Sequence, residues 1–194
     1  MRKLERYDLM DYVQYEEKRA EFRLNSTKIK EPRRIFLGDK LLFIFENTEM
    51  VRDHVLETIR IEKLFSEHDL LRQLDIYNPL IADAGEIRCT MIILGHTDWE
   101  KPEKIKPWKE LSSHIYLVSN EGRKIYAHTP DFPSINQHPG TLRVLSFMCG
   151  NEYPVAIGSD YKDYKLEAKL RDSQQKALQE DLTVKENVLR PTLH

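Results

Sequence analysis

The second half of the chain is a series of short β-prone segments, and this pattern restricts the fold more than any other feature. After Gly85 come EIRCTMIIL, HIYLV, RKIYAH, TLRVLSFM and YPVAIG, rich in β-branched or aromatic residues and bounded by Gly, Pro, Asn or Asp. A connection as short as Ser119-Asn120-Glu121-Gly122 favours antiparallel pairing, because a parallel neighbour needs a crossover of a dozen or more residues. The sequence therefore predicts a mainly antiparallel, strongly twisted sheet.

The first half is predicted to be helical apart from one hairpin. Asp11 can cap a helix and Gln14 can complete a capping box, and the helix continues towards Lys30 until Pro32 ends it. Two β-prone runs on either side of Gly38-Asp39 predict a hairpin with a tight turn.

Three more helices are expected from their N-terminal caps. The caps are, in chain order, Asn47 or Thr48, then Ser66 with Asp69, then Asp172 with Gln175. The last helix is short and ends near Leu182, and residues 183–194, which have no clear period, are expected to form a mobile tail. The predicted fold is α+β, with N-terminal helices packed on the sheet and a short C-terminal helix.

Composition indicates one domain, residues 1–194, and excludes several classes of protein. The chain has 194 residues, 40% of them hydrophobic and 32% charged, enough for one core but too few for two comfortable domains. Lys and Arg number 30 against 32 acidic residues, so we expect no nucleic-acid binding. The N-terminus has no apolar signal core and no stretch is long enough to span a membrane, which predicts a cytoplasmic protein.

The two cysteines are predicted to be structural. Cys89 and Cys149 form neither a metal-binding pair nor a disulfide framework. Cys89 shares one face of an alternating run with Ile87, Met91 and Ile93, which is typical of a buried thiol.

A carboxylate interrupts the apolar stripe of the helix VRDHVLETIRIEKLF, residues 51–65. At about 100° per residue, Val51, Val55 and Ile59 fall on one arc, and Glu62 falls within it. If this arc faces the core, the carboxylate leaves water, and a buried charge without a partner is not tolerated. We therefore expect Glu62 to be paired, hydrogen-bonded, protonated or bound to a metal.

Three interpretations of Glu62 stay open at this point. It forms a structural contact, for which the candidate partners are Arg19, Arg23, Arg34, Arg143, Tyr77 and Asn78. It lines a pocket as a base or a metal ligand, because buried carboxylates with shifted pKa values gather at functional sites. In the third interpretation the stripe leans towards Met50, Ile61 and Leu64, which leaves Glu62 at its edge.

Histidines offer a second set of candidate ligands. His54 and Glu57 are three residues apart on one helix, so their side chains are neighbours and can begin a metal site, although such pairs are more often surface contacts. Imidazole and carboxylate suit iron or zinc, but the sequence has no H-E-x-x-H set to complete the site. His114 and His128 would face each other if the strands around them pair across the turn at Gly122.

Other catalytic motifs are missing from the sequence. It has no G-x-G-x-x-G, no phosphate loop and no G-x-S-x-G elbow, which argues against nucleotide use and serine hydrolysis. Tyr161-Lys162-Asp163-Tyr164 brings two phenols and a carboxylate together, but tyrosines at strand edges usually serve packing.

Several segments, in this order and spacing, carry a family resemblance over nearly the whole chain. They are QYEEKRAEFR, RRIFLGDKLLFIFEN, IRIEKL, YNPL followed by Gly85-Glu86, VAIGSDYKDY and ALQEDL. Together they resemble the bacterial family known as domain of unknown function 3501. The matching positions are Arg19, Phe22, Arg23, Arg34, Gly38, Asp39, Asn47, Arg60, Glu62, Tyr77, Asn78, Gly85, Glu86, Asp160 and Tyr164. Tyr161 departs from the pattern, since a histidine is expected there in some relatives.

The resemblance implies a role in bacterial peroxide or iron handling. Members of the family are often encoded beside rubrerythrin and an iron–sulfur oxidoreductase, so these two proteins are the expected partners, and a homodimer is left open. The family supplies no catalytic residues that could be carried over to this chain.

The leading hypothesis is a non-enzymatic accessory protein that binds a ligand or a partner. Its polar centre would comprise Glu62, Arg60, Tyr77, Asn78 and Glu86, with Arg19 or Arg23. The alternative is a metal-dependent enzyme in which Glu62 and histidines hold iron or zinc. A third class is an interaction protein whose unusual polar residues only fix the fold.

Overall fold

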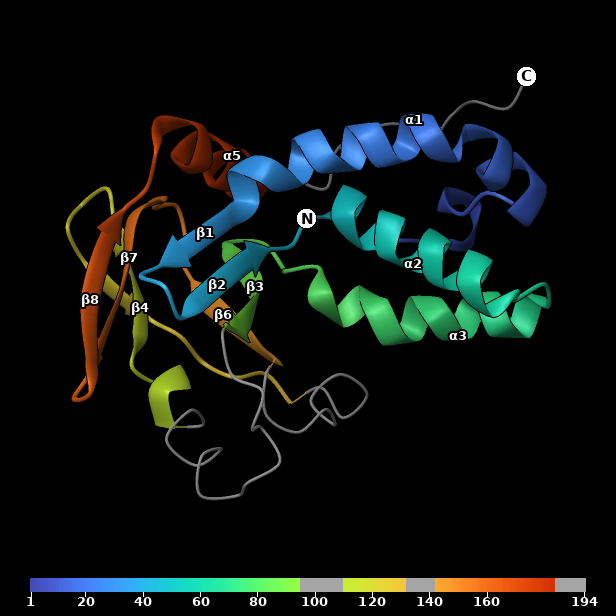
Figure 1. The fold of residues 1–194 in the computed structure, drawn as a ribbon. Coiled ribbons are helices and arrows are strands. Elements are labelled where there is room, and N and C mark those ends of the chain that lie inside the picture. Colours follow the sequence, from blue (N-terminus) through green and yellow to red (C-terminus); the bar gives the residue numbers. More distant parts are fainter. Residues whose placement is uncertain (95–109, 132–141, 184–194) are drawn as a thin grey trace.

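Antiparallel sheets and a layer of helices make up the computed structural model, which describes residues 1–94, 110–131 and 142–183. Helices α1 (Tyr12–Lys30), α2 (Thr48–Glu62) and α3 (Glu67–Tyr77) lie next to one another and extend away from the sheets (Figure 1). The predicted α+β class is confirmed. Most of the predicted tail at 183–194 lies outside the described residues.

Within the described residues the strands form two four-stranded sheets, and each pairing there is antiparallel. Sheet A has the order β1 (Arg34–Leu37), β2 (Leu41–Phe45), β3 (Glu86–Ile93), β6 (Leu142–Met148). Sheet B has the order β5 (Lys124–Tyr126), β4 (Ile115–Ser119), β7 (Pro154–Tyr161), β8 (Tyr164–Lys169). Helix α5 (Asp172–Thr183) contacts β3 of one sheet and β7 of the other.

Local sequence signals account for most helix ends. The side chains of Asp11, Asn47 and Ser66 each accept a hydrogen bond from the backbone N–H three residues later, as expected of N-caps. Helix α1 ends at Lys30, and the chain continues through the 3-10 turn η2 (Glu31–Arg33). The expected Asp172–Gln175 box at α5 is wrong, because Gln174 provides the contact by accepting from the N–H of Arg171.

The hairpin turn at Gly38 also receives a contact from sheet B. Gly38 has φ +61°, and a Cβ at this position would lie 2.6 Å from the hydroxyl oxygen of Tyr164. That hydroxyl donates a hydrogen bond of 2.5 Å to the carbonyl of Leu37. Tyr164 therefore has the predicted packing role, with a polar tip that fastens β8 to the β1–β2 turn.

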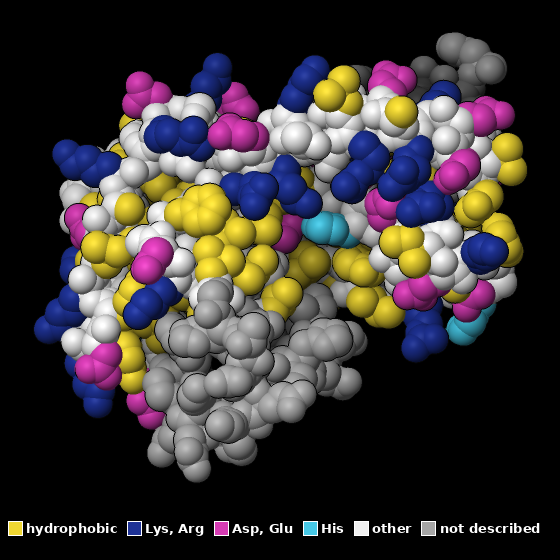
Figure 2. Space-filling model, in the orientation of Figure 1, with side chains coloured by type: hydrophobic (Ala, Val, Ile, Leu, Met, Phe, Trp, Pro, Cys, Tyr) yellow, Lys and Arg dark blue, Asp and Glu magenta, His cyan; other side chains and the backbone are white. Residues whose placement is uncertain are grey.

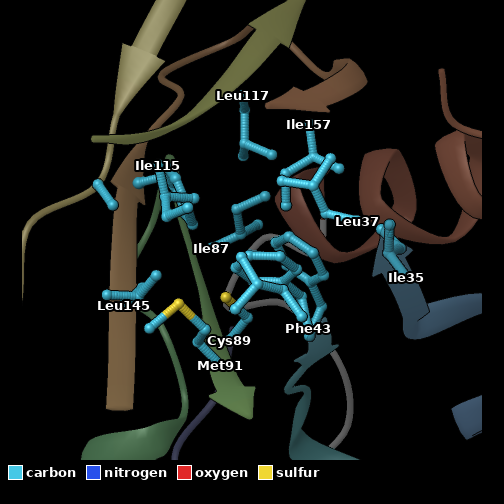
Figure 3. Close-up of a cluster of buried hydrophobic side chains, with 14 of the residues drawn as sticks. Ile35, Leu37, Phe43, Ile87, Cys89, Met91, Ile115, Leu117, Leu145 and Ile157 are labelled. Atoms are coloured by element: carbon cyan, nitrogen blue, oxygen red, sulfur yellow. The ribbon is translucent and has the colours of Figure 1, made fainter. Parts of the chain in front are cut away.

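The main core lies between the two sheets. In Figure 3, side chains from sheet A, among them Phe43, Ile87 and Met91, point towards Leu117 and Ile157 of sheet B. The predicted face of Ile87, Cys89, Met91 and Ile93 belongs to this core. Burial raises the pKa of both thiols, that of Cys149 to about 12, so the cysteines are unreactive at neutral pH.

The other face of sheet A points towards the helices. Val144 of β6 packs with apolar residues of α2 and α3 in a second core, which includes Val51, Val55 and Leu74. Ile44 and Ile92 on the same face are only partly buried, so the helices do not cover this face completely. In the described part of the chain, no helix combines the length and apolar content needed to cross a bilayer.

A buried ion pair joins the N-terminal and C-terminal parts of the fold. The Arg33 guanidinium donates to both carboxylate oxygens of Asp181, at 2.7 and 2.8 Å, and both side chains are less than 10% exposed. Asn47, the cap of α2, reaches the same carboxylate at 3.4 Å. Loss of one partner of such a pair typically costs about 3–5 kcal/mol, because the other charge stays buried.

Glu57 fastens α1 to α2. Its carboxylate accepts hydrogen bonds from Tyr15 at 2.8 Å, from Arg19 at 2.7 Å and from Arg60 at 3.2 Å. Burial alone would raise the pKa of Glu57, but the hydrogen bonds from Arg19, Tyr15 and Arg60 outweigh it and lower the pKa to about 2. Because the folded pKa lies below the unfolded value of 4.5, Glu57 stabilises the fold above about pH 4.5 and loses this effect as pH falls towards 2.

We predict that Glu57→Gln lowers the free energy of unfolding by only about 1–2 kcal/mol at pH 7, because solvent at the partly exposed Arg19 weakens the ion pair. The difference from wild type should shrink between about pH 4.5 and pH 2, as measured by urea unfolding at a series of pH values. Glu17→Gln, which changes an exposed acid of α1, is the matched control. A difference that does not change with pH would contradict the ionic role of Glu57.

Candidate functional site

Glu62 is exposed, and the expectation of its burial is wrong. It is the last residue of α2, and Lys63 then turns the chain with φ 52°. One turn earlier Ile59 is 3% exposed, while Ile61 and Phe65 are both 66% exposed, so the stripe leaves the core after Ile59. Glu62 falls on the same arc of the helix as Val55 and Ile59, but Ile59 is the last residue of that arc that the core buries.

The residues predicted to surround Glu62 contact other groups. Arg19 and Arg60 bind Glu57, and Arg23 pairs with Asp53 at 3.2 Å. Asp53, which was not predicted, is the buried carboxylate of α2.

Two further members of the predicted centre are structural tethers. Asn78 donates to the carbonyl of Leu4 and accepts from its N–H, at 2.9 and 2.8 Å, which holds the N-terminal segment against the end of α3. Glu86 is buried, forms an ion pair with Arg88 at 2.6 Å, and accepts a hydrogen bond from Ser146. These contacts lie apart from the residues that bind Glu57, so the predicted polar centre does not form as one site.

The predicted pair of His54 and Glu57 is also separated. Glu57 is used by α1, whereas the Nε2 atom of His54 lies 3.7 Å from a carboxylate oxygen of Glu46. Among the described residues, no group of three or more His, Cys, Asp or Glu side chains is placed to hold a metal ion.

Strands β4 and β5 pair as the sequence suggested, with Tyr116 opposite Tyr126. His114 lies just before β4, and His128 lies beyond β5, where it forms a bridge with Ser146 of β6. The two rings nevertheless have different partners. His114 bonds Asp160 through Nδ1 at 2.8 Å, and the Nε2 of His128 lies 3.8 Å from Glu86.

A pocket of about 330 Å³ opens where the helices stop covering sheet A, and we call it the Glu46 pocket. Its lining comprises Lys30, Ile44, Glu46, His54, Ile76, Tyr77, Leu80, Thr90, Ile92 and Leu142. Figure 2 shows a hollow between the sheets and the helices, with hydrophobic side chains in its floor and a histidine at its edge. Of the predicted site residues, Tyr77 and His54 line this pocket.

Glu46 is the unusual residue of the pocket, because it is 4% exposed and incompletely bonded. Its Oε1 accepts a hydrogen bond from the Thr90 hydroxyl at 3.2 Å. Its Oε2 is buried without a hydrogen-bond partner among the described residues. The 3.7 Å to His54 exceeds the range of a hydrogen bond. A carboxylate in this state presents one strong acceptor at the wall of an apolar pocket.

Two aromatic rings line the same pocket as Glu46. The rings of His54 and Tyr77 are nearly parallel, with an angle of 11° and centroids 6.5 Å apart. The Tyr77 hydroxyl is held by Thr58 at 2.9 Å. Tyr77 is therefore fixed, whereas His54, whose side chain is 36% exposed, has solvent on one side.

Sequence reasoning missed Glu46 and Thr90, although a signal exists for both. Leu42, Ile44 and Glu46 alternate along β2, so Glu46 continues an apolar face just before the cap of α2. Thr90 lies opposite Ile44 on the neighbouring strand and points to the same face. The missing information was which strands pair and how far the helices cover this face.

Comparisons with known proteins agree with this architecture. Residues 3–182 match the model of a family described as protein of unknown function (DUF3501). The chain belongs to this family. A crystal structure of a protein of unknown function from Burkholderia pseudomallei K96243 is similar to this DUF3501 chain, with a TM-score of 0.82 and 21% identity. The match covers 93% of this chain and all of the other, and at this identity it establishes the fold alone. None of the curated proteins that were compared matches.

We predict that Glu46→Gln stabilises the ligand-free DUF3501 chain, because the variant removes a buried charge that lacks a full set of donors. The free energy of unfolding should rise by about 1 kcal/mol, measured by urea unfolding at pH 7. Glu62→Gln, an exposed position on α2, should leave it within about 0.5 kcal/mol of wild type. A clear loss of stability in Glu46→Gln would mean that the carboxylate is satisfied within the protein.

Proposed function

We propose that this DUF3501 protein is a cytoplasmic, non-enzymatic binding protein that holds a small ligand in the Glu46 pocket. One observation carries the proposal: a buried carboxylate oxygen without a hydrogen-bond partner forms part of the wall of an apolar pocket. Small-molecule sites are typically concave, mostly apolar and provided with a few polar groups that orient the ligand. The pocket volume of about 330 Å³ lies at the lower end of the usual range of about 300–1,000 Å³.

Binding is favoured over catalysis by the functional groups that line the pocket. The lining offers one carboxylate, one imidazole and one lysine among apolar side chains, and both cysteine thiols are buried elsewhere. Glu46 and His54 are 3.7 Å apart, and the hydroxyls of Thr90 and Tyr77 are bonded to Glu46 and Thr58. Among the described lining residues, the amine of Lys30, in the last turn of α1, is the remaining nucleophilic group. The carboxylate, the imidazole and the lysine are sufficient to orient a bound ligand, which is why we propose binding and not catalysis.

The metal-dependent alternative loses its main residue. Glu62, the proposed ligand, is exposed at the end of α2, and Glu57 is occupied by Tyr15 and arginines. The described residues contain no other cluster with the required ligands.

The first test is whether a small molecule co-purifies with the protein. We expect that mass spectrometry of the denatured wild-type protein detects a bound compound, and that Ile76→Trp, which fills the pocket from α3, reduces it at least several-fold. Leu71→Trp places the same side chain on an exposed position of α3 and should retain the compound.

Absence of any compound above background in wild type, or equal amounts in Ile76→Trp and Leu71→Trp, would contradict binding in this pocket. Thermal unfolding of both variants verifies that they are folded. The comparison distinguishes a filled pocket from an unfolded protein as the cause of lost binding.

The biological setting is part of the same proposal. The family resemblance suggests a role as an accessory in peroxide or iron stress, beside rubrerythrin or an iron–sulfur oxidoreductase. We predict that the tagged protein retains rubrerythrin of the same bacterium at low salt and releases it as salt is raised, because transient partners rely on polar contacts. Repeated failure to co-purify either protein would contradict the proposed partners but would not bear on ligand binding in the Glu46 pocket.

A further inference from the structure

We infer that the ligand of the Glu46 pocket is a protonated amine with an apolar body. The inference rests on the proposed function and adds the chemical class of the ligand. It follows from the charge at the pocket wall, the rings beside it and the apolar surface below it.

The charge requirement comes from Glu46. The carboxylate of Glu46 is only 4% exposed and needs donors for both oxygens, but Thr90 supplies one donor to Oε1 only. A neutral donor from the ligand would complete the hydrogen bonding of Oε2 but bring no positive charge to the carboxylate. An ammonium group supplies both a donor and an opposite charge, and such charge-assisted bonds are roughly twice as strong as neutral ones.

The rings define how the amine enters. Because Oε2 is buried, an ammonium group reaches it when the imidazole of His54, which is partly exposed, turns away from the carboxylate. Tyr77, whose hydroxyl is bonded to Thr58, has its ring nearly parallel to that of His54. A cation that takes the place of the imidazole would therefore meet the face of the Tyr77 ring. A cation within about 6 Å of an aromatic centroid is attracted by the negative face of the ring.

The rest of the pocket selects the apolar body. Ile44 and Ile92 of sheet A, Leu142 of β6, and Ile76 and Leu80 at the end of the helical layer form most of the lining. Burial of apolar ligand surface here contributes roughly 25 cal/mol per Å². A short aryl-alkyl amine fits both requirements, because its ammonium group can bind Glu46 and its aryl group can pack on the apolar lining.

Lys30, the lysine in the lining, provides a test of whether the ligand is a cation or an anion. It lies in the last turn of α1, where the helix dipole favours a positive charge without any ligand. Its ammonium repels a cationic ligand and would attract an anionic one. Removal of this charge must therefore strengthen the binding of an amine and weaken the binding of a carboxylate.

The experiment compares three probes of similar size by isothermal titration calorimetry with the full chain. These are 2-phenylethylamine, the neutral 2-phenylethanol and the anionic 3-phenylpropionate. We expect the amine to bind wild type most tightly, Glu46→Gln to weaken the amine about tenfold, and Lys30→Ala to strengthen it several-fold. The alcohol should bind both wild type and Glu46→Gln with equal affinity.

Equal binding of amine and alcohol, unchanged amine affinity in Glu46→Gln, or weaker amine binding in Lys30→Ala would each overturn the inference. If Glu46→Gln fails to fold, the change in amine affinity caused by Lys30→Ala still tests the inference, since stronger binding supports a cationic ligand and weaker binding contradicts it. A co-purified compound without a protonated amine would overturn the inference and leave the proposed function standing. Absence of both a co-purified compound and probe binding would overturn both.

Discussion

Sheet A is buried on both of its faces, and the arrangement of the other elements depends on this double burial. One face packs against sheet B through side chains such as Phe43, Met91 and Leu145. The other receives the helices through Val144 and the stripe of α2 that includes Val51 and Val55. The helical layer is narrower than the sheet, since Ile44 and Ile92 stay half-buried. The Glu46 pocket is the space that this mismatch leaves, so its position follows from the packing of the sheet.

Polar side chains hold the helical layer in register with this sheet. The Arg88 guanidinium, from β3, donates to the carbonyls of Pro79 and Ile81 and pairs with Glu86 on its own strand. On the far side, Arg33 and Asp181 join the end of α1 to α5. The Arg88 contacts bind the segment that contains Leu80, one of the lining residues, to sheet A. The apolar part of the pocket is therefore present without a ligand, and only the imidazole of His54 has to move to expose Oε2.

Much of this fold could be predicted from the sequence, because its signals are local. The caps at Asp11, Asn47 and Ser66 and the buried face of Cys89 depend on residues a few positions apart. The division of the strands into two sheets could not, since it depends on the pairing of β3 with β6 across a long stretch of chain. The site was misplaced for a related reason. A helical projection gives the direction of Glu62 but not the point along the axis at which the covering layer ends.

Two buried carboxylate oxygens without hydrogen-bond partners occur in the described structure, and only one of them is a good candidate for ligand binding. Asp53 leaves Oδ1 unbonded, but its Oδ2 accepts from Ser26 at 2.7 Å and from Arg23 at 3.2 Å, so its charge is balanced. Glu46 has Thr90 alone within hydrogen-bond distance and lines the larger and more apolar hollow. An unbalanced charge costs stability unless something outside the chain neutralises it. This difference between two otherwise similar carboxylates places the candidate site at Glu46, directly after β2, and not on helix α2.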